Sequence, residues 1–331
     1  MIGSGGVEVE RKVNTILRVL SESNEAVGAR IIGRQLKKYG VDLSERAVRY
    51  HLKLMDERGL TQLVGRDGRQ ITPAGVEELQ NALVGDKVGL FMNRIETVSF
   101  RTTFDWKSRS GCVPANLSLF DKDDFPKALK AMAIAFKAGI SVGDLVGVAG
   151  EGERLGERIV PKGKIGFATV CSAVVTGALL KAGVPMDSKF GGILQIRNRR
   201  PLRFAELIYY SGTSLDPSEV FIRGKMTDVS GAAKKGDGKV LGNFAEVPGQ
   251  CSSLAEDMMA KLKEARLGSL MMMGKPGEPI CEVVVDPNRV GVLMLGGLNP
   301  VAAAEEAGIP AENAAICSVV EYSQLRSFWD L

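Results

Sequence analysis

Apolar residues recur at helical spacing through the first sixty positions of the chain, and this pattern predicts three consecutive helices. The first helix is expected over residues 7–22. The second is expected over residues 29–39, with Ile31, Ile32 and Leu36 directed inward. Both segments are amphipathic, so each is expected to bury one face against its neighbours.

The third predicted helix lies between Ser44, a residue type that caps helix N-termini, and Gly59, which can end a helix. Val48, Leu52 and Met55 form its apolar stripe. The opposite face carries cations and one aromatic ring, at Arg46, Arg49, Tyr50 and Lys53. Such a face suits the major groove of DNA. The alternative is a solvated cationic face with no ligand.

A basic β-hairpin is predicted directly after this helix, because Thr61–Val64 and residues 69–72 flank an Asp-Gly turn. Arg66 and Arg69 are expected on this hairpin as contacts to DNA. Thr72 and Pro73 then begin another helix. Three helices followed by a two-stranded wing are the order of a winged helix-turn-helix domain, which usually binds DNA and in some proteins binds protein or RNA.

The remainder of the chain is expected to form an α/β domain, so that the whole is α+β, with a boundary that divides the chain into residues 1–85 and 86–331. Short strands are expected near residues 88–92 and 98–104. A helix is expected over residues 121–138, followed by a glycine-rich strand-and-turn segment.

An internal repeat is the most informative feature of this second domain. Residues 165–185 and 290–310 align without a gap at a shift of 125 positions, and both read as a buried strand, a turn of small residues and a helix that ends in Ala-Gly-Val/Ile-Pro. Each is followed by another apolar segment. We therefore expect a βαβ-like unit that occurs twice.

Composition separates the two domains further. The chain carries a net charge of +4, and residues 30–70 alone contain ten Lys/Arg against five Asp/Glu. A basic first domain beside a nearly neutral second one indicates a polyanionic partner for the first. No signal peptide or membrane-spanning run is expected, and five widely spaced cysteines without a CxxC motif favour a cytoplasmic protein.

The single histidine, His51, lies in the predicted DNA helix. Residues 86–331 contain no histidine, which excludes Ser-His-Asp and Cys-His catalysis and His-ligated metals within that domain. No metal or cofactor is expected.

Two strand-to-helix turns are candidates for binding a small anion, because helix N-termini present free N–H groups. Residues near them offer hydroxyl, amide, thiol or ammonium groups: Cys171, Ser172, Thr176, Lys189, Ser211, Thr213, Ser214 and Asn299. A dicarboxylate would suit such a site. The alternative is that these side chains only cap helices and satisfy turns. Neither turn has the GxGxxG or P-loop pattern of a nucleotide site.

Several long strings in the second domain are similar to those of the NrpR family of transcriptional repressors of nitrogen-assimilation genes. They are TVCSAVVTGALLKAGVPMDSKFGGILQI, YSGTSLDPSEVFI, NFAEVP and VGVLMLGGLNPVAAAEEAGI. The resemblance covers nearly the whole chain and implies one regulatory domain after the winged helix. Where the family often has Asn, this chain has Thr176.

The resemblance implies a homodimer that binds a palindromic operator and leaves it when 2-oxoglutarate occupies the regulatory domain. By motif, it carries the effector role to Cys171, Ser172, Ser211, Thr213, Ser214 and Asn299, with Lys189 as a partner for a carboxylate. Two other hypotheses remain. One is an enzyme that acts on a small keto acid, and the other is a redox sensor that uses the Cys171 thiol.

Overall fold

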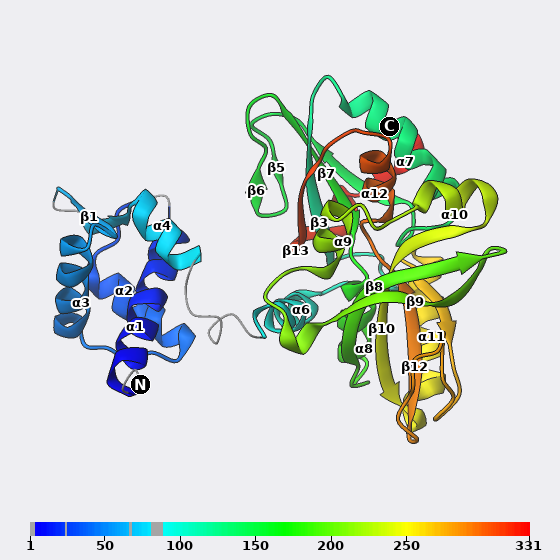
Figure 1. The fold of residues 1–331 in the computed structure, drawn as a ribbon, viewed down its shortest axis with the longest axis horizontal. Coiled ribbons are helices and arrows are strands. Elements are labelled where there is room, and N and C mark those ends of the chain that lie inside the picture. The colour runs from blue at the N-terminus through cyan, green and yellow to red at the C-terminus, as the bar shows by residue number, and fades with distance from the viewer. Residues whose placement is uncertain (1–3, 24, 66–67, 81–88) are drawn as a thin grey trace. The chain divides into compact units, whose positions relative to one another are not determined.

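The computed structural model describes residues 4–23, 25–65, 68–80 and 89–331, and its chain divides into two compact units, residues 1–87 and 88–331. The expected wing contact Arg66 lies outside the described residues. We call residues 1–87 the winged-helix unit and residues 88–331 the regulatory unit, after the family resemblance. Both are drawn in Figure 1.

The winged-helix unit has the predicted order of elements. These are α1 (Ser4–Ser21), α2 (Ala29–Leu36), η1 (Lys37–Tyr39), α3 (Glu45–Glu57), β1 (Thr61–Val64), β2 (Gly68–Ile71) and α4 (Pro73–Gln80). The Ser44 hydroxyl accepts a hydrogen bond from the Ala47 N–H at 3.2 Å, and the Thr72 hydroxyl accepts one from the Gly75 N–H at 3.1 Å. Both predicted helix caps are confirmed.

The core of the winged-helix unit is built from the predicted apolar stripes, with Ile32, Leu52 and Met55 fully buried. One prediction is wrong, because Ile31 is 50% exposed. Adjacent helical residues point about 100° apart, so Ile32 takes the inner face and turns Ile31 toward solvent.

The regulatory unit begins with a helix where strands were predicted. Residues 90–101 form α6 (Leu90–Arg101), and Phe91, Ile95 and Val98 lie on its buried side. Their spacing of four and three residues is helical. The two short apolar runs that were taken for strands therefore belong to one amphipathic helix.

Two five-stranded antiparallel sheets form the centre of the regulatory unit. The first has the order β13-β3-β7-β4-β14, and the second has the order β11-β12-β10-β8-β9. The elements of the first chain half are β3 (Cys112–Asp121), α7 (Phe125–Lys137), β4 (Leu145–Ala149), β5 (Arg154–Leu155), β6 (Arg158–Ile159), β7 (Lys164–Val170), α8 (Ala173–Lys181) and β8 (Asp187–Arg197). A connecting part contains β9 (Arg200–Tyr209), η2 (Tyr210–Gly212), α9 (Pro217–Arg223) and α10 (Val229–Lys235).

The second chain half repeats the order of the first. It comprises β10 (Gly238–Pro248), η3 (Gly249–Cys251), α11 (Ser252–Glu264), β11 (Leu270–Met273), β12 (Arg289–Leu295), α12 (Asn299–Glu306) and β13 (Glu312–Glu321). The chain ends with η4 (Tyr322–Gln324), β14 (Arg326–Ser327) and η5 (Phe328–Asp330). The predicted strand–helix repeat is therefore confirmed, and it extends over nearly the whole regulatory unit.

The two halves exchange their last strands. After α8 the chain leaves the sheet of β7, and β8 pairs with β10 of the second half. After α12 it returns, and β13 pairs with β3 of the first half. The repeat was predicted as βαβ-like, but its two strands lie in different sheets and the helix carries the chain between them. This reciprocal exchange makes the halves pseudo-symmetric and mutually dependent.

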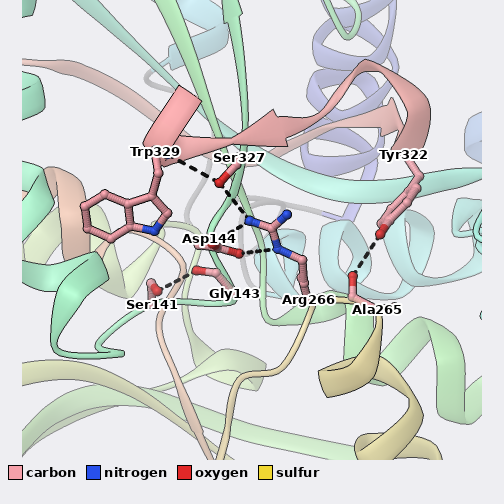
Figure 2. A network of polar contacts seen from close by, with 8 residues as sticks. All are labelled: Ser141, Gly143, Asp144, Ala265, Arg266, Tyr322, Ser327 and Trp329. Carbon is pink, nitrogen blue, oxygen red and sulfur yellow. Dashed lines mark hydrogen bonds and ion pairs between the residues drawn. The ribbon is translucent and has the colours of Figure 1, made fainter. Parts of the chain in front are cut away.

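The C-terminal segment is held by a polar network around Arg266 (Figure 2). The Arg266 guanidinium donates to the Asp144 carboxylate, with an Nε–Oδ1 distance of 2.8 Å, and to the Ser327 hydroxyl at 2.8 Å. The Tyr322 hydroxyl donates to the Ala265 carbonyl at 3.0 Å. These contacts join the end of the chain to both halves of the regulatory unit.

Candidate functional site

The exposed face of α3 carries the side chains expected to meet DNA. Arg46, Arg49 and Lys53 are exposed, and Tyr50 is 61% exposed. Arg49 lies 2.7 Å from Glu45, and Lys53 lies 3.9 Å from the carboxylate of Glu57. Exposed ion pairs of this kind contribute little stability, so both cations can exchange their carboxylate partners for phosphates at small cost.

Arg69 has a different position from the one expected for a wing contact. Its Nε lies 2.7 Å from Oδ2 of Asp56 on α3, and its side chain is only 21% exposed. The Thr61 hydroxyl donates to the other oxygen of Asp56 at 2.6 Å, and the Arg69 backbone pairs with Val27. Arg69 therefore anchors the β1–β2 hairpin to α3.

A cavity in the regulatory unit lies where the two halves meet. The residues that begin α8 line it on one side, and Gly297 and Leu298, which precede α12, line it on the other. Asn116 of β3 and Asn243 of β10 also line it. These two amides occupy equivalent places, because Asn116 pairs in register with Thr169 of β7 and Asn243 pairs with Met294 of β12. The cavity has a volume of about 30 Å³.

A chain of hydrogen bonds runs along one wall of this cavity. The buried Tyr210 hydroxyl donates to Oδ1 of Asn243 at 2.7 Å, and Nδ2 of Asn243 donates to the Ser172 hydroxyl at 2.9 Å. Burial raises the pKa of Tyr210, so its hydroxyl remains a donor at neutral pH. The Cys171 sulfur accepts a weak hydrogen bond from the Ala173 N–H at 3.4 Å.

Some of the expected effector residues converge on the cavity and others do not. Cys171, Ser172 and Thr176 line it. Lys189 lies elsewhere on β8 and forms ion pairs with Asp187 at 2.6 Å and Glu246 at 3.3 Å. Two carboxylates therefore already neutralise its charge, and a role as the partner of an effector carboxylate is not supported by this geometry.

Asn299 is fully buried and does not line the cavity. Its amide accepts a hydrogen bond from the Leu241 N–H at 2.7 Å and donates to the carbonyls of Leu241 and Gly296 at 2.9 and 3.1 Å. This side chain fixes the turn before α12 against β10. We correct its expected role from ligand contact to structural support.

The hydroxyl-rich loop after β9 also differs from expectation. Ser211, Thr213 and Ser214 are not among the lining residues, and the Thr213 hydroxyl is hydrogen-bonded to the Leu215 backbone. The same loop does supply Asp216. This carboxyl lines the cavity, and burial, together with the charge of Glu219, raises its pKa to about 6.

Sequence reasoning missed several lining residues, which are Phe91, Ile95, Asn116, Tyr210, Asp216 and Asn243. Phe91 was missed because residues 88–92 were taken for a strand, and Ile95 was missed because it lies between the two strands predicted there. Asn243 and Asp216 lie inside the strings NFAEVP and SLDP, so those motifs already contained the signal.

None of the helices in the described ranges is long and apolar enough to cross a membrane. No group of three or more His, Cys, Asp or Glu side chains in that part of the chain is arranged to hold a metal ion.

Comparison with known proteins gives matches to both units. Residues 88–327 match the family described as NrpR regulatory domains NRD1 and 2, and residues 14–79 match the Ribonuclease R winged-helix domain. A crystal structure of a nitrogen repressor-like protein from Methanococcus jannaschii aligns with a TM-score of 0.62 and 28% identity, over 73% of this chain and 98% of that chain.

Similar full sequences carry related names. The chain is 39% identical to the global nitrogen regulator NrpRI of Methanosarcina mazei, over 96% of this chain and 98% of that protein. It is 33% identical to the global nitrogen regulator NrpR of Methanococcus maripaludis, over 94% of this chain and 54% of that protein. The chain thus spans nearly all of the first relative and about half of the second.

Proposed function

This chain belongs to the NrpR family, and on that premise we propose that it represses nitrogen-metabolism genes by binding operator DNA through its winged-helix unit. The observation that carries the proposal is the exposed face of α3, with Arg46, Arg49, Tyr50 and Lys53 on a helix whose other side is buried. Such a helix can enter the major groove, where Arg and Lys donate to guanine and to phosphates. A homodimer would place two of these helices on a palindromic operator.

We further propose that a dicarboxylate, with 2-oxoglutarate as the first choice, binds in the cavity between the two halves. Residues at the starts of α8 and α12 line the cavity, and Asn116 and Asn243 add amide donors. These groups suit a ligand with a carboxylate at each end.

The size of the cavity makes this binding a candidate switch. A volume of about 30 Å³ holds one or two water molecules, far less than a ten-atom dicarboxylate needs. The effector would therefore bind an opened arrangement of the two halves. If the opened arrangement binds operator DNA less tightly, the effector weakens DNA binding by linkage.

The buried Asp216 carboxyl adds a pH dependence to the proposal. An ionised Asp216 would repel a dicarboxylate, whereas the protonated form can donate a hydrogen bond to it. Because the pKa of Asp216 is about 6, the effector should bind more tightly at pH 6 than at pH 8.

The test is fluorescence anisotropy with a labelled promoter fragment at fixed salt, with and without millimolar 2-oxoglutarate. We expect tight binding that Arg49→Ala or Lys53→Ala weakens, since each removes a cation from α3. Lys38→Ala, which removes an exposed cation from η1 of the same unit, is the matched control. Equal binding by all four proteins would refute the groove assignment, and indifference to 2-oxoglutarate would refute the effector.

A further inference from the structure

A second group of cations lies on the regulatory unit, where the β8–β9 hairpin end meets α10 (Figure 1). We call it the hairpin surface. Its exposed members are Arg197, Arg199, Arg200, Arg203, Lys225, Lys234, Lys235 and Lys239. Within the described residues none of these eight forms an ion pair, in contrast to Arg49 and Lys53 on α3.

The strand register brings these cations together. Arg197 and Arg200 are directly paired across the hairpin. Arg203 of β9 and Lys239 of β10 both pair with Gln195 of the strand between them, so the three side chains form one row across the sheet. The spacing between adjacent strands is about 4.8 Å, so the two cations of this row lie roughly 10 Å apart.

The turn of the hairpin is fixed against the end of α10. The Arg199 N–H donates to the Gly236 carbonyl at 2.8 Å, which brings the turn to the two lysines that end this helix. Acids also lie in this region, and two of them accept hydrogen bonds from the backbone. Asp237 accepts from the Asn198 N–H at 2.7 Å, and Asp228 accepts from the Gly231 N–H at 2.9 Å. A carboxylate that accepts such a bond keeps its charge, so these two acids and Glu206 of β9 offset the eight cations only in part, and the surface remains positive overall.

Such an arrangement is unfavourable for the free protein. Like charges directly opposite each other in an antiparallel pair destabilise the sheet, and the Arg197–Arg200 pair is of this kind. A bound polyanion removes this repulsion. Between the hairpin, the loop after α9 and β10 lies a cleft of about 440 Å³, whose charged lining residues are the cations Arg197, Lys225 and Lys239 and the acids Asp228 and Asp237.

We propose that the hairpin surface binds the phosphate backbone of duplex DNA, in addition to the contact made by α3. This inference rests on the proposed function, since the same chain is proposed to hold DNA through its winged-helix unit. DNA that is held by the winged-helix unit is at high local concentration for the hairpin surface of the same chain. Duplex DNA fits better than an acidic protein, because protein partners usually need buried aromatic or aliphatic anchors. Among the cations of the hairpin end the exposed large apolar residue that the structure describes is Leu202, at 39%, whereas Leu207 and Tyr209 are exposed farther along β9.

The test compares variants of the full chain on a labelled 40-base-pair duplex of mixed sequence, by anisotropy between 50 and 200 mM KCl. The hairpin variant combines Arg197→Gln, Arg200→Gln and Lys239→Gln. Loss of the Arg197–Arg200 repulsion should stabilise this variant, so unfolding would not explain weaker binding. The matched control combines Lys130→Gln, Lys137→Gln and Lys162→Gln, three exposed lysines elsewhere on the regulatory unit.

A third protein, the α3 variant, combines Arg46→Gln, Arg49→Gln and Lys53→Gln. We expect the hairpin variant to bind about tenfold more weakly at 100 mM KCl, and its salt slope to fall by about two to three, since each phosphate contact contributes about 0.9. The α3 variant should retain weak, salt-dependent binding, which is lost when both sets are combined.

The outcomes separate the two claims. A hairpin variant that matches the control in affinity and slope overturns this inference, including the case in which the surface serves an acidic protein. An α3 variant that binds like wild type, while the hairpin variant loses affinity, overturns the proposed role of α3 and supports the hairpin surface.

Discussion

The two halves of the regulatory unit share one order of elements but present different chemistry to the cavity between them. The first half supplies the thiol of Cys171 and the hydroxyls of Ser172 and Thr176. At the positions that follow from the 125-residue shift, the second half has Gly296, Gly297 and an apolar residue. The fold is therefore nearly symmetric, while the site is not.

The halves also differ in how firmly the start of each helix is held. Asn299 ties the turn before α12 to Leu241 of β10 through two hydrogen bonds, and a third joins it to Gly296 of the turn itself. The equivalent residue at the start of α8 is Val174, which has no polar side-chain atom. The start of α8 is held to β10 by one side-chain bond, from Asn243 to Ser172, so it is the less firmly held of the two and the better candidate to move when the cavity opens.

The largest effect is expected from Asn299→Ala. The change leaves the Leu241 N–H without its partner in a fully buried place, which costs about 1–3 kcal/mol, and it removes one of the two hydrogen bonds that each of the Leu241 and Gly296 carbonyls accepts. We expect the regulatory unit to lose about 3 kcal/mol of unfolding free energy, measured by urea denaturation. Asn299→Asp keeps the acceptor for the Leu241 N–H but sets a buried carboxylate oxygen against the Leu241 and Gly296 carbonyls, so it should be no more stable than Asn299→Ala. A loss below about 1 kcal/mol for Asn299→Ala would contradict the fixed role of this turn.

The next largest effect is expected from Gly297→Ala. A Cβ atom there would lie 2.3 Å from the Val170 carbonyl oxygen and 2.5 Å from Nδ2 of Asn116, so the backbone and the cavity wall must shift. We expect a loss of about 2 kcal/mol and weaker effector binding. Ser172→Ala, at the equivalent position of the first half, should leave stability within about 1 kcal/mol. If Gly297→Ala and Ser172→Ala lost equal unfolding free energy, the two helix starts would not differ in how tightly they are packed.

A smaller effect is expected from Asp216→Asn, in the segment between the halves. Because the pKa of Asp216 is raised to about 6 in the folded protein, its stability contribution is full below pH 3.8 and is lost as the pH rises through 6. The neutral variant keeps the side-chain oxygen that caps α9. It should therefore be about 1–2 kcal/mol more stable than wild type at pH 8.

Thermal unfolding of wild type and Asp216→Asn at pH 5 and pH 8 measures this difference. The gain should be larger at pH 8 than at pH 5. The variant should also bind 2-oxoglutarate with an affinity that changes less between pH 6 and pH 8. An equal gain at both values of pH would show that the carboxyl does not change its protonation between them, which contradicts a pKa of about 6.

The smallest effect is expected from the two equivalent amides. Asn243→Ala breaks the chain from Tyr210 to Ser172, and we expect about tenfold weaker binding of 2-oxoglutarate by calorimetry, which corresponds to about 1.4 kcal/mol. Asn116→Ala should weaken binding less, since its contact to the Thr169 hydroxyl is long, at 3.4 Å. A larger loss of affinity in Asn116→Ala than in Asn243→Ala would show that Asn116, and not Asn243, makes the main amide contact to the effector.

The winged-helix unit was predicted almost completely from the sequence, and the reasons are local. Ser44, Thr72 and Gly59 act within a few residues of their own position, and an apolar stripe needs only one helix to be visible. Ile31 was misassigned because spacing does not say which of two adjacent isoleucines faces the core. Arg69 was misassigned because its partner Asp56 lies thirteen residues away, on another element.

The sequence by itself determined the two-part organisation of the chain, the cationic face of α3 and the repeat at a shift of 125, since periodicity and identity are properties of short segments. Only the tertiary structure decided that β8 and β13 exchange sheets, and that Asn116, Ser172, Tyr210 and Asn243 meet at one cavity. Strand exchange depends on which hydrogen-bonding edges remain open after each half has folded. Convergence of side chains depends on contacts between residues far apart in the chain, and neither leaves a local pattern in the sequence.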